Sequence, residues 1–473
     1  MKSVKEPSDI SRRSFLLGAG CAGMDISLPG DLFSDEQITA PMDFYSPKMS
    51  LSSNESEILE GSEGPVMQKI MSTVVRLGDL FDATHLAPLD QPIHSVASFA
   101  LTYFRPMFNI VRELKKNNIS TTMPFSCNPG PTDYKNVEVN LPEKGAFRVM
   151  FPTQERFIRN LKSIGMKSEG GFSCACYHDE VGVIPNFGDI LCWSESSAVS
   201  FANSVLGARS NRNSGIFDFF CGVLGKTPYY GLLTDEGRRA NFVVNIKSSK
   251  KPDPWVLGKI LGTDVQDGVP YIKGLDRFLG GDLTPMNKGY FKDMGAAAAS
   301  YGSIGLYHAE GLTPEAKASG ESLIVEGATT IDIDDKMLAD RLKELMSETR
   351  PSRVRLETCL IGCPHNSLDQ LYYWTDLIEK ALKTARRSKV AIKTILVAAP
   401  ETIVKFKEDP KGYRRLAATG AELGGLCALM HAKNPLIGQS GRIISNSSKL
   451  SHYGDVIFAP EAAIVKSIVK GAI

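Results

Sequence analysis

From residue 346 onward, the chain alternates between short apolar runs and longer segments with helical periodicity. The runs VRLETCLIG, VAIKTILVA, GGLCALM, GRIIS and VIFAPE each predict a buried strand. The segments SLDQLYYWTDLIEKALKTARR and PETIVKFKEDPKGYRRLAATG each predict a helix between two of these strands. This βαβ order predicts a parallel sheet with helices on both faces.

The preceding region, residues 51–345, mixes both kinds of pattern. Apolar residues recur at helical spacing from Ile58 to Phe81, in MFNIVRELKKNN and in WVLGKILG, while YYGLLT and NFVVNI predict short strands. The run WSESS predicts a polar helix start with Ser194 as its N-cap. We therefore expect an α/β fold of parallel sheets flanked by helices, with two domains over residues 51–345 and a third over residues 346–473.

Residues 1–50 are expected to be an extension outside the folded domains. Ser11–Leu17, SRRSFLL, has the form of a twin-arginine export signal, but the apolar segment after it is short. A disordered extension, or a true start at Met49, are the alternatives. The chain has no run of eighteen apolar residues, so we expect no transmembrane helix and a cytoplasmic protein, with twin-arginine export as the alternative.

Charge and cysteine usage narrow the possible partners. The 54 basic and 53 acidic residues give a net charge of +1, which does not favour nucleic acid or a general membrane surface as partner. Nine cysteines are scattered over 473 residues. An odd and scattered set argues against a disulfide framework and for reduced thiols, some of them available to a metal.

Three cysteines lie where ligands often bind. Cys174 lies on a loop upstream of the polar WSESS run, Cys363 ends a predicted strand, and Cys427 lies in or near another. None has the C-x₂-C spacing of a recognisable metal site, so buried structural thiols are the ordinary interpretation. Three thiolates around an iron cluster would leave one iron open to act as a Lewis acid.

Two further residues allow both a structural and a functional interpretation. Asn128 follows a predicted strand in the turn Cys-Asn-Pro-Gly, which is ordinary turn chemistry at a place where ligands also bind. His308 lies on a predicted loop, where a histidine serves either as a catalytic acid or base or in structural hydrogen bonds.

Several segments, in chain order, resemble the large subunit of the aconitase X family. They are LEGSEGPVMQKIMSTVVRLGDLFDA, CNPGPTDY, SCACY, WSESSAVSFANSVLGARSNR, GSIGLYHAEGLTPEA, GCPH and SNSSKLSHY. The resemblance covers the chain from about residue 50 to its end. It implies an aconitase-like multi-domain α/β fold and an iron-dependent hydro-lyase, which removes water from a small hydroxy acid. The expected substrate is cis-3-hydroxy-L-proline, and phosphomevalonate is the alternative.

The resemblance also implies roles for individual residues. The metal ligands would be Cys174, Cys363 and Cys427, holding an iron–sulfur cluster (4Fe–4S or 2Fe–2S) or a mononuclear iron. The substrate-binding residues would be Ser98, Asn128, Pro129, Glu195, Ser196 and Lys449, and Glu195, Ser196 and Lys449 of these would be catalytic. Two positions depart from the family pattern: Val96 stands where a glycine is usual, and Cys176 where a proline is usual.

A partner is implied as well. Aconitase-type sites are completed by a small swivelling domain, which would here be a separate small subunit, so we expect the chain alone to be inactive. A non-catalytic iron–sulfur sensor with the same fold is the competing class of function.

Overall fold

The structure is a computed structural model that describes residues 45–99, 105–168, 171–348, 355–438 and 442–472. All of them belong to one compact unit, Met42–Ile473. The segment Ser11–Leu17, with its resemblance to a twin-arginine signal, lies outside the described residues.

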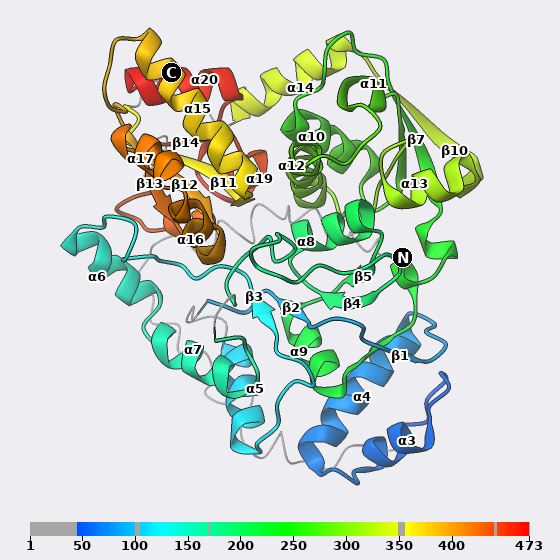
Figure 1. Cartoon of the computed structure of the whole chain (residues 1–473). Coiled ribbons are helices and arrows are strands. Elements are labelled where there is room, and N and C mark those ends of the chain that lie inside the picture. The colour runs from blue at the N-terminus through cyan, green and yellow to red at the C-terminus, as the bar shows by residue number, and fades with distance from the viewer. Residues whose placement is uncertain (1–44, 100–104, 169–170, 349–354, 439–441, 473) are drawn as a thin grey trace, which may run out of the picture. The chain divides into compact units, whose positions relative to one another are not determined.

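A five-stranded parallel sheet forms the C-terminal part of the chain, as the βαβ pattern predicts (Figure 1). Its strands, in spatial order, are β13 (Glu422–Gly424), β12 (Lys393–Ala398), β11 (Thr358–Asn366), β14 (Ile443–Ser445) and β15 (Ile457–Phe458). The helices of this region are α15 (Leu368–Thr384), α16 (Pro400–Glu408), α17 (Pro410–Ala418), α18 (Ala428–Ala432), α19 (Ser448–Tyr453) and α20 (Glu461–Lys470).

Two predictions for this region are wrong in detail. The segment from Pro400 to Gly420 forms two helices, because Asp409 caps a new helix whose first residue, Pro410, cannot donate a backbone hydrogen bond. GGLCALM is not one strand: β13 ends at Gly424, and Cys427 is the N-cap of α18.

Two more parallel sheets lie in the preceding region. One contains β3 (Ser126–Cys127), β2 (His94–Ser95), β4 (Ile190–Trp193) and β5 (Arg209–Arg212). The other contains β10 (Ile324–Ile333), β7 (Ala240–Ile246), β8 (Pro270–Lys273) and β9 (His308–Ala309). A short antiparallel pair joins β1 (Leu86–Pro88) to β6 (Lys226–Pro228). The predicted α/β class with parallel sheets flanked by helices is therefore confirmed.

The helices of this region differ from the predicted ones at two places. The expected helix from Ile58 to Phe81 is two helices, because Gly61 and Gly64 take positive φ angles of 102° and 89° between them. YYGLLT contains a 3₁₀ turn, Gly231–Leu233, instead of a strand. The α-helices are α3 (Ser53–Glu60), α4 (Pro65–Leu80), α5 (Arg105–Lys116), α6 (Leu141–Met150), α7 (Gln154–Ser163), α8 (Ser196–Phe201), α9 (Gly215–Leu224), α10 (Pro254–Val265), α11 (Asp276–Leu279), α12 (Pro285–Tyr301), α13 (Pro314–Ser319) and α14 (Asp335–Glu348), and a π-helical turn, Ala202–Leu206, continues α8.

Helix α12 connects the elements that carry the candidate site. It packs closely on α10, because a Cβ atom on Gly258 would collide with the Met294 carbonyl oxygen. It also contacts α8, α19 and β11. Three consecutive alanines of α12, Ala296, Ala297 and Ala298, are buried in the main apolar core. Helix α12 therefore contacts three elements that are far apart in the sequence.

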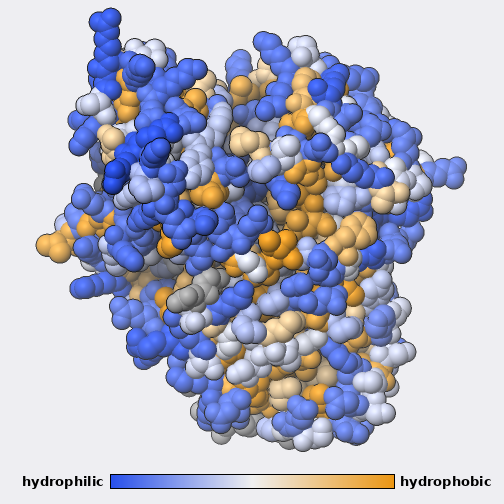
Figure 2. All heavy atoms as spheres, viewed as in Figure 1, coloured by the Kyte–Doolittle hydropathy of each residue, from blue (hydrophilic) through white to orange (hydrophobic). Residues whose placement is uncertain are grey.

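On the face seen in Figure 2, hydrophilic residues predominate and apolar residues form separate patches. Among the exposed apolar side chains is Leu141, the first residue of α6, which is 82% exposed. None of the described helices is both long enough and apolar enough to cross a membrane.

Candidate active site

The predicted site residues follow the carboxyl ends of strands in two parallel sheets. In the four-stranded sheet that contains β2, these residues are Ser98 after β2, Asn128 and Pro129 after β3, and Glu195 and Ser196 after β4. In the five-stranded sheet, Cys363 lies near the end of β11, Cys427 follows β13, and Lys449 follows β14 at the start of α19. Carboxyl ends of parallel strands are the usual place for ligand binding in such folds.

Ser98 is hydrogen-bonded to both Asn128 and Pro129. The Ser98 backbone N–H donates to Asn128 Oδ1 at 3.1 Å, and its hydroxyl donates to the Pro129 carbonyl oxygen at 2.8 Å. Ser98 and Asn128 are buried. These bonds join the loops after β2 and β3 into one wall of the candidate site.

Burial separates the three predicted metal-binding cysteines from the others. Among the eight cysteines in the described part of the chain, Cys174, Cys363 and Cys427 are partly exposed and the other five are buried. The three thiols also perturb one another's pKa pairwise, so they share one electrostatic environment. Within the described ranges, however, no three Cys, His, Asp or Glu side chains are placed as a ready-made site for one metal ion.

His365 links the three cysteine segments. It lies two residues after Cys363, its backbone N–H donates to Cys174 Sγ at 3.2 Å, and its ring Nε2 donates to the carbonyl oxygen of Leu426, next to Cys427, at 3.0 Å. Sequence reasoning did not single out this histidine.

The donor set fits an iron centre. Burial, together with the nearby Glu195 carboxylate, raises the pKa of Cys174, Cys363 and Cys427 to about 12. Thiols in such a place stay neutral at pH 7 unless a cation stabilises the thiolates. A bound metal supplies that charge and displaces the protons.

Glu195 and Lys449 form a buried ion pair. Lys449 Nζ lies 2.7 Å from Glu195 Oε1, and the two side chains are 11% and 12% exposed. Burial raises the pKa of Glu195, but the charge and hydrogen bond of Lys449 lower it more, and the result lies below the ordinary value. Burial lowers the pKa of Lys449, but Glu195 raises it more, so its net shift is upward. Both side chains are therefore charged at neutral pH.

The start of α8 differs from the prediction. Glu195, not Ser194, is the N-cap residue, and its side chain caps no backbone N–H. The Ser194 hydroxyl instead accepts the backbone N–H of Val96 at 2.9 Å. Ser194 thereby ties its own loop to the loop of Ser98, and Ser196 becomes the first residue of the helix.

Two other residues have structural partners. His308 lies on β9, is 1% exposed, and its Nε2 donates to the Arg238 carbonyl oxygen at 2.8 Å, which is a structural hydrogen bond. Cys176 is fully buried in the main apolar core, whereas Cys174 is partly exposed.

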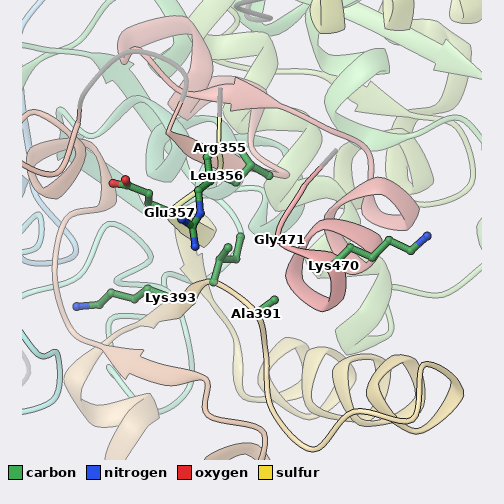
Figure 3. A pocket seen from close by; sticks show the side chains of 8 residues that line it. Arg355, Leu356, Glu357, Ala391, Lys393, Lys470 and Gly471 are labelled. Carbon is green, nitrogen blue, oxygen red and sulfur yellow. The ribbon is translucent and has the colours of Figure 1, made fainter. Parts of the chain in front are cut away.

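A cavity beside the five-stranded sheet lies at the opposite end of its strands from Cys363. Figure 3 shows this cavity of about 600 Å³, lined by Arg355, Leu356, Glu357, Ala391, Ile392, Lys393, Lys470 and Gly471. These residues precede or begin β11 and β12, or end α20. They therefore lie at the amino ends of the strands, away from Cys363 at a carboxyl end.

Two family models match the chain. One, described as the aconitase X first domain, matches residues 48–236, and the other, described as the aconitase X second domain, matches residues 240–343. Together they cover more than half of the chain. This chain belongs to the aconitase X family.

Individual relatives agree with this membership. The phosphomevalonate dehydratase large subunit of Methanocaldococcus jannaschii is 32% identical over 439 residues, which are 89% of this chain and 100% of that protein. The cis-3-hydroxy-L-proline dehydratase of Pseudomonas aeruginosa is 27% identical over 319 residues, 65% of this chain and 52% of that protein. The crystal structure of Thermococcus kodakaraensis aconitase X (holo-form) matches with a TM-score of 0.73 at 26% identity, over 89% of this chain and 100% of that one.

Membership in the aconitase X family fixes the class of reaction. The relatives are dehydratases, and this chain is a hydro-lyase of the aconitase X type. The family points to an iron-containing cofactor, which the chemistry of the three thiols fits.

Proposed function

We propose that this chain is the large subunit of a dehydratase that acts on cis-3-hydroxy-L-proline. In that reaction the C3–O bond and the C2–H bond break, a C2=C3 double bond forms, and the hydroxyl group and the proton leave as water. The substrate carries one carboxylate and one secondary ammonium group at neutral pH. The proposed site must therefore bind one negative and one positive charge.

The observation that carries this choice is the ion pair of Glu195 and Lys449. Lys449 spends two of its three N–H donors on Glu195 Oε1 and Ser197 Oγ, and Glu195 Oε2 accepts no hydrogen bond from a described residue. One ammonium donor and one carboxylate oxygen thus remain for a ligand. We assign the donor to the substrate carboxylate and the oxygen to the substrate ammonium or to the proton that leaves C2.

The remaining residues would position the substrate and hold the metal. Ser98, Asn128, Pro129 and Ser196 would orient the substrate from loops that are already hydrogen-bonded together. Cys174, Cys363 and Cys427 would hold an iron–sulfur cluster or a single iron. When bound, that centre would supply Lewis acidity toward the departing hydroxyl.

Phosphomevalonate is the second candidate substrate. Large subunits of phosphomevalonate dehydratase from Thermococcus kodakarensis and Methanocaldococcus jannaschii are 31% and 32% identical to this chain, and 95% and 100% of their length is matched. The hydroxyproline enzymes of Pseudomonas aeruginosa and Hypocrea jecorina are 27% and 25% identical. Overall similarity thus favours the phosphorylated substrate, and the charge balance of the site favours the amino acid.

The name "large subunit" in these relatives supports a second chain here too. We propose that a small subunit closes the site of this chain before turnover. The competing function is a non-catalytic iron–sulfur sensor on the same fold.

The test offers both compounds to the anaerobically iron-loaded complex of this chain with its small subunit. Loss of one water is followed by mass spectrometry, and kcat/KM is compared. A higher kcat/KM on cis-3-hydroxy-L-proline supports the first proposal. Turnover of phosphomevalonate alone would show that the chain belongs to a phosphomevalonate dehydratase instead. If iron binds but neither compound is turned over, the iron–sulfur sensor is the remaining function.

A further inference from the structure

Ser197 connects both members of the buried ion pair, although no sequence motif distinguishes it from its neighbours. Its hydroxyl donates to Glu195 Oε1 at 3.1 Å and accepts a hydrogen bond from Lys449 Nζ at 3.3 Å. The side chain is 1% exposed and lies on the second residue of α8. Ser197, Glu195 and Lys449 therefore form a closed triangle of hydrogen-bonding atoms.

The two carboxylate oxygens of Glu195 differ in their hydrogen bonds to this triangle. Oε1 receives both Lys449 Nζ and the Ser197 hydroxyl, and Oε2 receives neither. A carboxylate with one ammonium partner can rotate and exchange its oxygens. A second donor on the same oxygen removes that freedom, because both bonds would have to break together.

The same contacts also orient Lys449. An ammonium group rotates freely about its Cε–Nζ bond and has three equivalent donors. Bonds to Glu195 Oε1 and Ser197 Oγ fix two of the three directions. The third N–H then points in one direction.

We propose that Ser197 is a positioning residue, which fixes Glu195 Oε2 and the third N–H of Lys449 as the two groups that meet the substrate. Ser197 itself does not touch the substrate. Its only O–H donor bonds to Glu195, its oxygen already accepts from Lys449, and the side chain is buried. The kinetic consequence rests on the function proposed above, whereas the geometric claim about Glu195 does not.

The experiment compares Ser197→Ala with Ser200→Ala, which is a matched control. Ser200 lies three residues further along α8, is fully buried, and its hydroxyl has no hydrogen-bond partner among the described residues. Both variants remove one buried hydroxyl from the same helix, but only one of these hydroxyls touches the ion pair. Ser197→Thr keeps the hydroxyl and serves as the rescue variant.

The first readout needs no turnover. With ¹³C-labelled glutamate, the carboxylate stretch of Glu195 is assigned by infrared difference against Glu195→Gln. Ser197→Ala should shift this band and Ser200→Ala should leave it in place. An unmoved band in Ser197→Ala overturns the inference, whatever the substrate of the enzyme.

The second readout is the split between KM and kcat in the two-subunit complex. Ser197→Ala should raise KM about ten- to a hundredfold, the effect of losing a hydrogen bond to a charged group, with kcat changed less. Ser197→Thr should restore most of the KM. A kcat/KM equal to that of the wild type, or an equal loss in the Thr variant, would mean a merely structural role and would overturn the inference.

Discussion

At the scale of single residues, chemistry depends on which polar groups stay accessible after burial. Three thiols are partly exposed, whereas the other five cysteines in the described part of the chain are buried. The Glu195 carboxylate and the Lys449 ammonium are buried together, and Oε2 of the first and one N–H of the second take no part in their contact. Buried groups of this kind are costly to form, so their presence at strand ends indicates function more than stability.

The thiols provide the first prediction. Cys174→Ser, Cys363→Ser or Cys427→Ser should each bleach the visible absorbance of the iron centre and abolish turnover, because each removes one soft ligand. Cys192→Ser and Cys221→Ser should do neither, because both thiols are buried. Absorbance and iron content of the purified variants measure the effect. Equal losses in all five variants would contradict the ligand assignment.

Lys449 provides the second. Lys449→Ala leaves Glu195 buried without its cation, so we expect a loss of about 3–5 kcal/mol, the usual cost of breaking a buried pair. The loss should appear in kcat/KM and in the free energy of unfolding measured with urea, while iron stays bound. Catalytic efficiency equal to that of the wild type would return Lys449 to a purely structural role.

The ion pair also predicts a dependence of stability on pH. The lowered pKa of Glu195 adds stability above its unfolded pKa of about 4.3, and this is lost as pH falls through the folded pKa. The raised pKa of Lys449 adds stability below about pH 10.4, and this is lost as pH rises through its folded pKa.

Urea unfolding of the wild type and of Glu195→Gln/Lys449→Met over a range of pH isolates this contribution. The unfolding free energy of the wild type minus that of the double variant should be constant between about pH 5 and 10. It should fall below about pH 5 and above about pH 10, because the wild type loses the stability of its ion pair there. A difference that favours the wild type most at the acid end would contradict the account.

At the scale of elements, short helices after the strands deliver the site residues. Ser447 is the N-cap of α19, the helix of Lys449, and accepts the Leu450 N–H at 3.2 Å. Its hydroxyl also donates to the Cys363 carbonyl oxygen at 2.6 Å. One serine thus couples the strand end of Cys363 to the helix that presents Lys449.

Ser447→Ala should therefore cost both stability and activity. The variant loses the helix cap and the hydrogen bond to the Cys363 carbonyl oxygen, so its free energy of unfolding should fall by about 1–3 kcal/mol. This should be seen as a lower Tm together with a reduced kcat/KM. Ser52→Ala is the control: it removes the capping box of α3, which carries no candidate site residue. The control should lower Tm but keep kcat/KM. Full activity in Ser447→Ala would refute the coupling.

Sequence reasoning succeeded where the information was local. The βαβ pattern after residue 346 predicted the parallel sheet. The prediction that Cys363 ends its strand is wrong in detail, because β11 continues to Asn366 and Cys363 lies inside it. The two-residue strands β2 and β3 are too short to produce a period. The breaks between helices at Gly61 and Asp409 depend on the local turn and capping residues, which the spacing of apolar residues does not reveal.

The roles of Ser197 and His365 could not be predicted in this way. Ser197 acts on Lys449, which is 252 residues away in sequence, and His365 donates to Cys174 across 191 residues. Such pairings depend on how the two sheets meet through α12, which no local pattern encodes. The resemblance of whole segments supplied the candidate ligands and substrate contacts, which stay predictions until the variants above are measured.

At the scale of the whole molecule, the candidate site is assembled from segments that are far apart in the sequence. α12 contacts α8, α19 and β11, so the elements carrying Glu195, Lys449 and Cys363 share one support. Because these elements pack on one helix, the part of the site that this chain contributes is already formed before a substrate or a second chain binds.

The partner proposal makes a prediction at this scale. Purified alone, the chain should bind iron but turn over neither substrate, because the closing domain that excludes water is missing. Addition of the small subunit should restore dehydration with a stoichiometry of one to one, measured by titration of activity. Full activity of the single chain would contradict the need for a partner.

The central claim is that water is lost at an iron centre held by three thiols from three segments. The most direct measurement titrates the anaerobic apo-complex with ferrous iron and sulfide and follows the dehydration rate against bound iron. The account predicts no turnover without iron, a rate that rises with bound iron and saturates with it, and neither gain nor iron binding in Cys427→Ser. Turnover by the iron-free complex at the rate of the loaded one would contradict it.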